Sequence, residues 1–173
     1  MHLHSRAGAR MSGDYTIAHL SAPDSDVRAL VRELDAEMAV LTPACEQRHG
    51  LTLDAIFQPH IRFFLAYAGR EAAACGGVAL LDGFAEVKRM YVRDNARGQG
   101  VADAILARIE ADTRRAGLAV LRLETGVRQL AAMRLYARAG FRECPAFGNY
   151  ASMAPQSIVT SVFLEKRIGL SAT

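Results

Sequence analysis

A loop with two glycines places the tightest constraint on how this chain can fold. Gly98 and Gly100 separate an apolar stretch at residues 84–92 from an amphipathic stretch at residues 101–116. The first stretch predicts a strand and the second predicts a helix. Because glycine lacks a Cβ atom, backbone N–H groups in this loop can approach a ligand closely. Together with the N–H groups and dipole at the start of the helix, the loop predicts a phosphate or pyrophosphate site.

Two common phosphate-binding loops match this stretch poorly. A P-loop ends in Gly-Lys-Ser or Gly-Lys-Thr, whereas Gly100 precedes Val101 and Ala102. A dinucleotide-binding loop needs a third small residue where Asp103 stands. On the local pattern alone, an ordinary strand-to-helix turn without a ligand is as well supported as an anion site.

Two longer motifs resemble the GNAT acetyltransferase superfamily. Its motif A, Gln/Arg-x-x-Gly-x-Gly/Ala, holds the coenzyme A pyrophosphate. It fits in two registers, residues 97–102 with Arg first and residues 95–100 with Asn first. Residues 129–141 resemble motif B, Asn-x-x-Ala-x-x-Leu-Tyr followed by Gly-Phe, although Gln129 replaces the usual Asn. Both registers stay open, and the resemblance covers roughly residues 71 to 167.

The remaining pattern predicts one domain at residues 14–173 after a disordered N-terminal extension at residues 1–13. Strands are expected at residues 15–20, 61–67, 71–81, 84–92, 120–124, 141–144 and 158–165, helices at 26–41, 51–57, 101–116 and 129–139, and a loop at 145–156. This order predicts an α+β fold with a mixed, mostly antiparallel sheet flanked by helices. The resemblance implies the same fold, with two strands splayed apart at the cofactor site. A phase shift between Val87 and Met90 predicts a β-bulge.

Composition excludes several other classes of protein. The net charge of +3 over 173 residues is small, and no basic run interleaved with aromatics suggests nucleic-acid binding. No stretch has the length of a membrane span, so no membrane association is expected. Cys45, Cys75 and Cys144 are widely spaced, which predicts reduced thiols in a cytoplasmic protein. The histidines lack ligand spacing, so no metal site is expected, and both a monomer and a homodimer stay open.

The resemblance also implies which residues contact acetyl-CoA. Backbone groups at residues 90–92 would hold the pantetheine arm and the acetyl group, and the Met90 N–H would polarise the thioester carbonyl. Residues 97–102 would hold the pyrophosphate. The implied cofactor-binding residues are Met90, Tyr91, Val92, Arg97, Gly98, Gln99, Gly100, Val101, Ala102 and Gln129.

Two residues are candidates for proton transfer. Tyr136 matches the motif B tyrosine that often protonates the leaving thiolate, and the alternative is a tyrosine packed in the core. Glu86 is the candidate general base, and the alternatives are a solvent-facing glutamate beside Lys88 or a chain of water molecules as the base. The acceptor would be chosen by the first helices and the last loop, which carry Glu46, Arg48, His49, Arg62, Asn149 and Tyr150.

The leading hypothesis is an N-acetyltransferase that moves an acetyl group from acetyl-CoA to a primary amine of a small molecule or peptide. One alternative is a catalytically silent domain of the same fold that senses acetyl-CoA. Another is a nicotinamide-dependent enzyme in which Glu124 binds a ribose, but the chain lacks the repeated strand–helix units that this fold needs.

Overall fold

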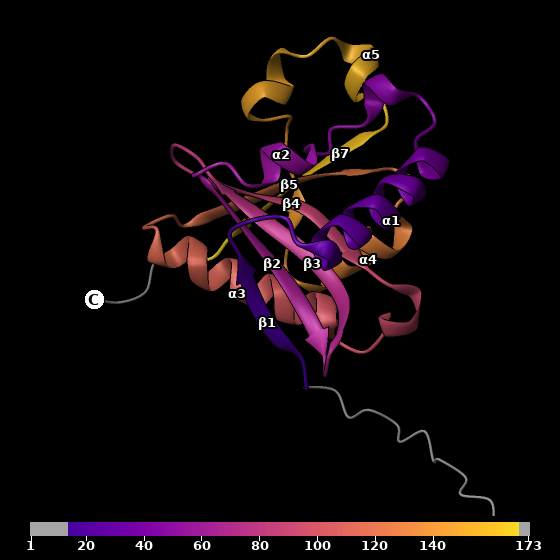
Figure 1. Ribbon diagram of the computed structural model, residues 1–173. Helices are drawn as coiled ribbons and strands as arrows, with labels where there is room; N and C mark the ends of the chain where they lie inside the picture. Colours follow the sequence, from indigo (N-terminus) through magenta and orange to yellow (C-terminus); the bar gives the residue numbers. More distant parts are fainter. Residues whose placement is uncertain (1–13, 170–173) are drawn as a thin grey trace, which may run out of the picture.

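A computed structural model describes residues 14–169 of the chain, so the extension expected at residues 1–13 lies outside the described residues. Seven strands form one sheet in the order β1-β2-β3-β4-β5-β7-β6 (Figure 1). The strands are β1 (Thr16–Leu20), β2 (Ile61–Ala68), β3 (Glu71–Leu80), β4 (Ala85–Val92), β5 (Val120–Gly126), β6 (Arg142–Glu143) and β7 (Ser161–Arg167). The β4–β5 pair is parallel and the other pairs are antiparallel. The expected mixed, mostly antiparallel sheet is therefore confirmed.

Helices cover both faces of this sheet (Figure 1). They are α1 (Ser25–Leu41), α2 (Leu53–Ile56), α3 (Val101–Arg115), α4 (Leu130–Arg138) and α5 (Pro155–Ile158), with short 3-10 turns η1 (Cys45–Gln47), η2 (Asp94–Ala96) and η3 (Gly148–Ser152). Alternation along β2 divides the core. Phe63 and Leu65 pack with α1 on one face, whereas Phe64 and Ala66 pack with α3 on the other. The two-residue period of the strand thus gives the sheet two apolar faces.

Four predictions about the element boundaries were wrong. Residues 145–156 were expected to form a loop, but they contain η3 and the start of α5. Pro155 stands in the first turn of α5, where its fixed φ favours a helix, so β7 begins at Ser161 instead of residue 158. The helix expected at residues 51–57 is limited to α2, whose first turn is capped by Thr52. β6 has two residues where four were expected.

The bulge expected in the strand at residues 84–92 is present. Cys75 pairs with Tyr91 and Gly77 pairs with Lys88, so β4 has one more residue than β3 between these two pairs. Arg89 absorbs the extra residue with a φ of 58°, in the left-handed region that non-glycine residues rarely adopt. The bulge turns β4 at the point where it leaves β5.

The splayed strands implied by the resemblance are also present. β4 and β5 pair at two positions, Ala85 with Leu121 and Glu86 with Arg122. Both strands continue past these pairs, β4 to Val92 and β5 to Gly126, without further pairing to each other. The sheet therefore opens between β4 and β5.

In residues 14–169, no helix is both long enough and apolar enough to cross a membrane.

Candidate active site

A cavity of about 330 Å³ lies at the opening between β4 and β5, and we call it the central cavity. Its walls come from α1, residues 47–50, β4, β5, α4, η3 and the residue before β7. Figure 1 shows the segment that contains η1 beside α5, above the sheet. Side chains hold this contact, because Gln47 Nε2 donates to the carbonyl of Gln156 at 3.2 Å and His49 Nε2 lies 2.9 Å from the carbonyl oxygen of Ser157. Residues far apart in the sequence thus enclose one space.

Glu86 lies in the wall of this cavity and is 6% exposed. Its Oε1 accepts a hydrogen bond from the Tyr150 hydroxyl at 2.8 Å and lies 2.6 Å from Lys88 Nζ. Lys88 Nζ also donates to the Tyr150 hydroxyl at 2.7 Å. Burial raises the pKa of Tyr150, and the charge of Glu86 raises it further, so its hydroxyl keeps its proton. Lys88 lies beside Glu86, as expected. The Glu86 side chain is buried, however, whereas the alternative interpretation placed it in solvent.

Glu124 is a second carboxylate in the wall of the central cavity. Its Oε1 accepts a hydrogen bond from Ser161 Oγ at 2.6 Å. Burial raises the pKa of Glu124, while the hydrogen bond from Ser161 and the charge of His49 oppose that shift. From the sequence, Glu124 was expected to act only as a ribose ligand, in the nicotinamide-dependent alternative. Its position beside the opening depends on the β5–β7 register, which no local pattern reveals.

Tyr136, from α4, also lines the central cavity and is 6% exposed. Its ring packs edge-on against Phe141 at a centroid distance of 5.6 Å. Burial raises the pKa of Tyr136, and the charge of Glu124 adds to the effect, so the phenol stays protonated at neutral pH. Tyr136 thus has the core packing of the structural alternative and also the access to the cavity that a proton donor needs.

Arg89 joins the bulge to α1 and to the segment at residues 47–50. Its side chain is 5% exposed, and its Nη2 lies 2.7 Å from Asp35 Oδ1. A Cβ atom added to Gly50 would lie 2.5 Å from Nη1 of Arg89, so the backbone at residue 50 passes directly over the guanidinium. The bulge therefore places a buried cation in the cavity wall.

The glycine loop, residues 97–102, lies after the end of β4. Gly98 and Gly100 have φ angles of 72° and 81°, and α3 begins directly after them. Gly100 occupies the N-cap position of α3 without a side-chain cap, which leaves the first N–H groups of the helix available to an anion. The Arg97 guanidinium lies 2.7 Å from Glu37 Oε2 and 3.0 Å from Asp94 Oδ1. The loop fits a pyrophosphate through its backbone, while Arg97 is ion-paired with carboxylates.

The other predicted site residues divide into two groups. Met90 and Gln129 line the central cavity, as do Arg48 and His49 from the predicted acceptor side. Glu46, Arg62 and Asn149 do not line the cavity, and Arg62 pairs instead with Asp112 of α3 at 3.2 Å. Among residues 14–169, no group of three or more His, Cys, Asp or Glu side chains could hold a metal ion.

The chain matches the model of one known protein family over most of its length. The model of the acetyltransferase (GNAT) family matches residues 27–141, which include β4, the glycine loop and Tyr136. The chain belongs to the GNAT family. Its sheet opens between β4 and β5, as the resemblance to this family implied.

Relatives support acetyltransferase activity for this GNAT protein. It is 40% identical over 153 residues to a protein of Azospirillum brasilense named "IAA acetyltransferase", and the match covers 87% of this chain and 96% of that protein. A solved structure from Klebsiella pneumoniae, of a proposed acyl-CoA N-acyltransferase, is 33% identical with a TM-score of 0.72 and covers 90% and 99% of the two chains. A GNAT structure from Elizabethkingia anophelis with acetyl-CoA bound is 18% identical, has a TM-score of 0.62, and covers 89% and 98% of the two chains.

Proposed function

We propose that this GNAT protein transfers an acetyl group from acetyl-CoA to a primary amine bound in the central cavity. One observation carries the proposal. A buried tyrosine, the buried carboxylate of Glu86 and the half-buried carboxylate of Glu124 line the same cavity between the splayed strands, so a proton donor and proton acceptors lie around one space. The acceptor is a small molecule or the end of a peptide, because the cavity volume is about 330 Å³.

Binding of the co-substrate is divided between two regions of the chain. The glycine loop and the start of α3 would hold the pyrophosphate through backbone N–H groups. The unpaired edge of β4 at residues 90–92 would hold the pantetheine arm, with the Met90 N–H directed at the thioester oxygen. When bound, acetyl-CoA supplies the activated acyl group. The protein supplies alignment of the amine with the thioester and exclusion of water.

The reaction needs one proton acceptor and one proton donor. The amine nitrogen attacks the thioester carbon, forming the N–C bond as the C–S bond breaks. The proton lost by the amine passes to Glu86 or to Glu124, the two carboxylates in the cavity wall. Tyr136 gives its proton to the departing sulfur. A phenol can take this role because it is still protonated at neutral pH when negative charge develops on sulfur.

Glu86 and Glu124 differ as proton acceptors. Glu86 is paired with Lys88 and hydrogen-bonded to Tyr150, and both partners contact its Oε1 oxygen. Glu124 has Ser161 as its hydrogen-bond partner, and burial raises its pKa toward the range that suits a general base. Glu86 remains our proposed base, with Glu124 as the second carboxylate to be tested beside it.

Because all three cysteines are free thiols, we also propose that the enzyme works in the cytoplasm.

The test is release of free coenzyme A with acetyl-CoA as donor over a panel of primary amines, with mass spectrometry of the products. An N-acetylated product in equal amount to the released thiol is expected. Tight acetyl-CoA binding without transfer to any amine would favour a catalytically silent sensor instead. No binding of acetyl-CoA would contradict both hypotheses.

A further inference from the structure

The charged residues around the central cavity do not all pair with each other. Three acidic residues, Asp35, Glu86 and Glu124, and three basic residues, Arg48, Lys88 and Arg89, line it. Asp35 pairs with Arg89 at 2.7 Å and Glu86 pairs with Lys88 at 2.6 Å. Among residues 14–169, neither Glu124 nor Arg48 has an ion-pair partner. One negative and one positive group are thus left to face whatever enters.

Glu124 is half-buried in the wall of this space. It comes from β5 beside the opening of the sheet and interacts electrostatically with Tyr136, the proposed donor to the leaving sulfur. An amine bound in the central cavity can therefore contact Glu124. A carboxylate whose hydrogen-bond partner is a single hydroxyl, Ser161, can accept a further hydrogen bond from that amine.

Arg48 lies on the outer side of the cavity and is exposed. Its two neighbours in the chain are fixed to the segment before β7. Gln47 donates to the carbonyl of Gln156 and accepts from Thr160 Oγ1 at 3.2 Å, and His49 lies 2.9 Å from the carbonyl oxygen of Ser157. The backbone at Arg48 is therefore held on both sides. This makes Arg48 a cation with a defined place, in contrast to a surface arginine on an unanchored loop.

We propose that the acceptor is a zwitterion, an amine that also carries a carboxylate, with its amine toward Glu124 and its carboxylate toward Arg48. α-Amino acids are the simplest class with this chemistry. A guanidinium suits the outer position because it binds a carboxylate through paired hydrogen bonds and stays charged at any physiological pH. This inference rests on the proposed acetyltransferase activity and specifies its acceptor.

Alanine, methionine and phenylalanine, each compared with its own carboxamide, provide the probes. The carboxamide keeps the amine and side chain and removes the negative charge. Wild-type enzyme and Arg48→Ala are assayed with each pair, and the ratio of their kcat/KM values is taken for each acceptor. Because both enzymes meet the same amine, this ratio cancels the different basicity of amino acid and amide.

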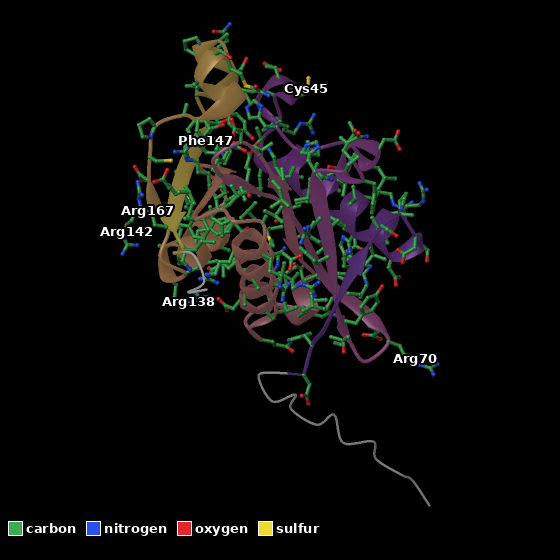
Figure 2. All side chains as sticks on the ribbon, turned by 90° about the vertical axis from the view of Figure 1, so that its left-hand side faces the viewer. Cys45, Arg70, Arg138, Arg142, Phe147 and Arg167 are labelled. Atoms are coloured by element: carbon green, nitrogen blue, oxygen red, sulfur yellow. The ribbon has the colours of Figure 1, made fainter. Side chains whose placement is uncertain are left out.

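We expect Arg48→Ala to raise KM for the amino acids about 2- to 5-fold, the range for an exposed ion pair, and to leave KM for the carboxamides unchanged. Arg48→Lys should retain part of the effect. The matched control is Arg70→Ala, since Arg70 projects from the β2–β3 turn, at the other end of the view from Cys45 of η1 (Figure 2). That variant should match wild type with every acceptor.

Two results would overturn the zwitterion proposal and leave the acetyltransferase standing. One is an equal effect of Arg48→Ala on amino acids and carboxamides. The other is that the wild-type enzyme acetylates amines that lack a carboxylate but acetylates no amino acid. Failure to acetylate any amine would overturn both the proposed function and this inference.

Discussion

The glycine loop and the central cavity lie along the same strand, β4, yet they are built in different ways. The loop relies on backbone, with two glycines of positive φ and the uncapped start of α3. The cavity relies on side chains from several elements, and most of their charges are paired with each other. A backbone site can hold a pyrophosphate whatever side chains surround it. A side-chain site can change its acceptor without altering the sheet.

The largest effect is expected from a substitution that disrupts the glycine loop and leaves the central cavity unchanged. Gly100→Glu forces a side chain into a backbone with φ of 81° and adds negative charge at the start of α3. The Kd for acetyl-CoA, measured by calorimetry, should rise roughly 100-fold or more, equivalent to about 3 kcal/mol.

Gly117→Glu is the matched control for this change. Gly117 also has a positive φ, of 77°, and lies beyond the other end of α3. It carries the same strain and the same charge away from the loop, so acetyl-CoA should bind to it as to wild type. Equal loss of affinity in both variants would mean that the glycine loop is not the pyrophosphate site.

The next effect breaks the cavity without touching the loop. Glu86→Gln keeps the shape and a hydrogen-bond partner for Tyr150 but removes a proton acceptor. We expect kcat to fall about 100-fold near neutral pH, with the Kd for acetyl-CoA unchanged. The defect should shrink as pH rises, because more of the amine is then already neutral.

Glu124→Gln and exposed Glu71→Gln, assayed over the same pH range, complete this comparison. Glu71→Gln should match wild type. If Glu86→Gln retains wild-type kcat while Glu124→Gln loses it, the proton goes to Glu124, and Glu86 serves to hold Lys88 and Tyr150 in place.

A smaller effect concerns the stability of the cavity wall. Burial raises the pKa of Glu124 above its ordinary 4.5, so the folded state loses stability as pH rises through that raised pKa. Glu124→Gln carries no such ionisation cost. Its melting temperature relative to wild type should increase by a few degrees between pH 4 and pH 8. A difference that does not change with pH would contradict a raised pKa at Glu124.

More of the glycine loop than of the central cavity could be predicted from the sequence. The glycine loop is contiguous, so its residues and its place before α3 could be predicted, and the phase shift in β4 gave the bulge at Arg89. Cavity contacts join residues far apart in the chain. Glu124 and Ser161 are separated by 37 positions and His49 and Ser157 by 108, which no local periodicity can reveal.

Tyr136 could be predicted in part from the sequence. Its helix and its motif could be read from contiguous residues, but its position near Glu124 depends on how α4 packs beside β5. The resemblance to motif B supplied the role that periodicity alone would have assigned to the core. The structure shows its packing and its place in the cavity wall, and its role in proton transfer stays a prediction.

The most direct test of the proposed mechanism is the single-turnover rate of Tyr136→Phe saturated with acetyl-CoA and a reactive amine. The variant keeps the ring packed on Phe141 and removes only the hydroxyl. We predict a rate roughly 100-fold below wild type and a Kd for acetyl-CoA within a few-fold of it, the pattern of an interaction made mainly in the transition state. An unchanged rate would contradict the mechanism and make Tyr136 a packing residue of α4.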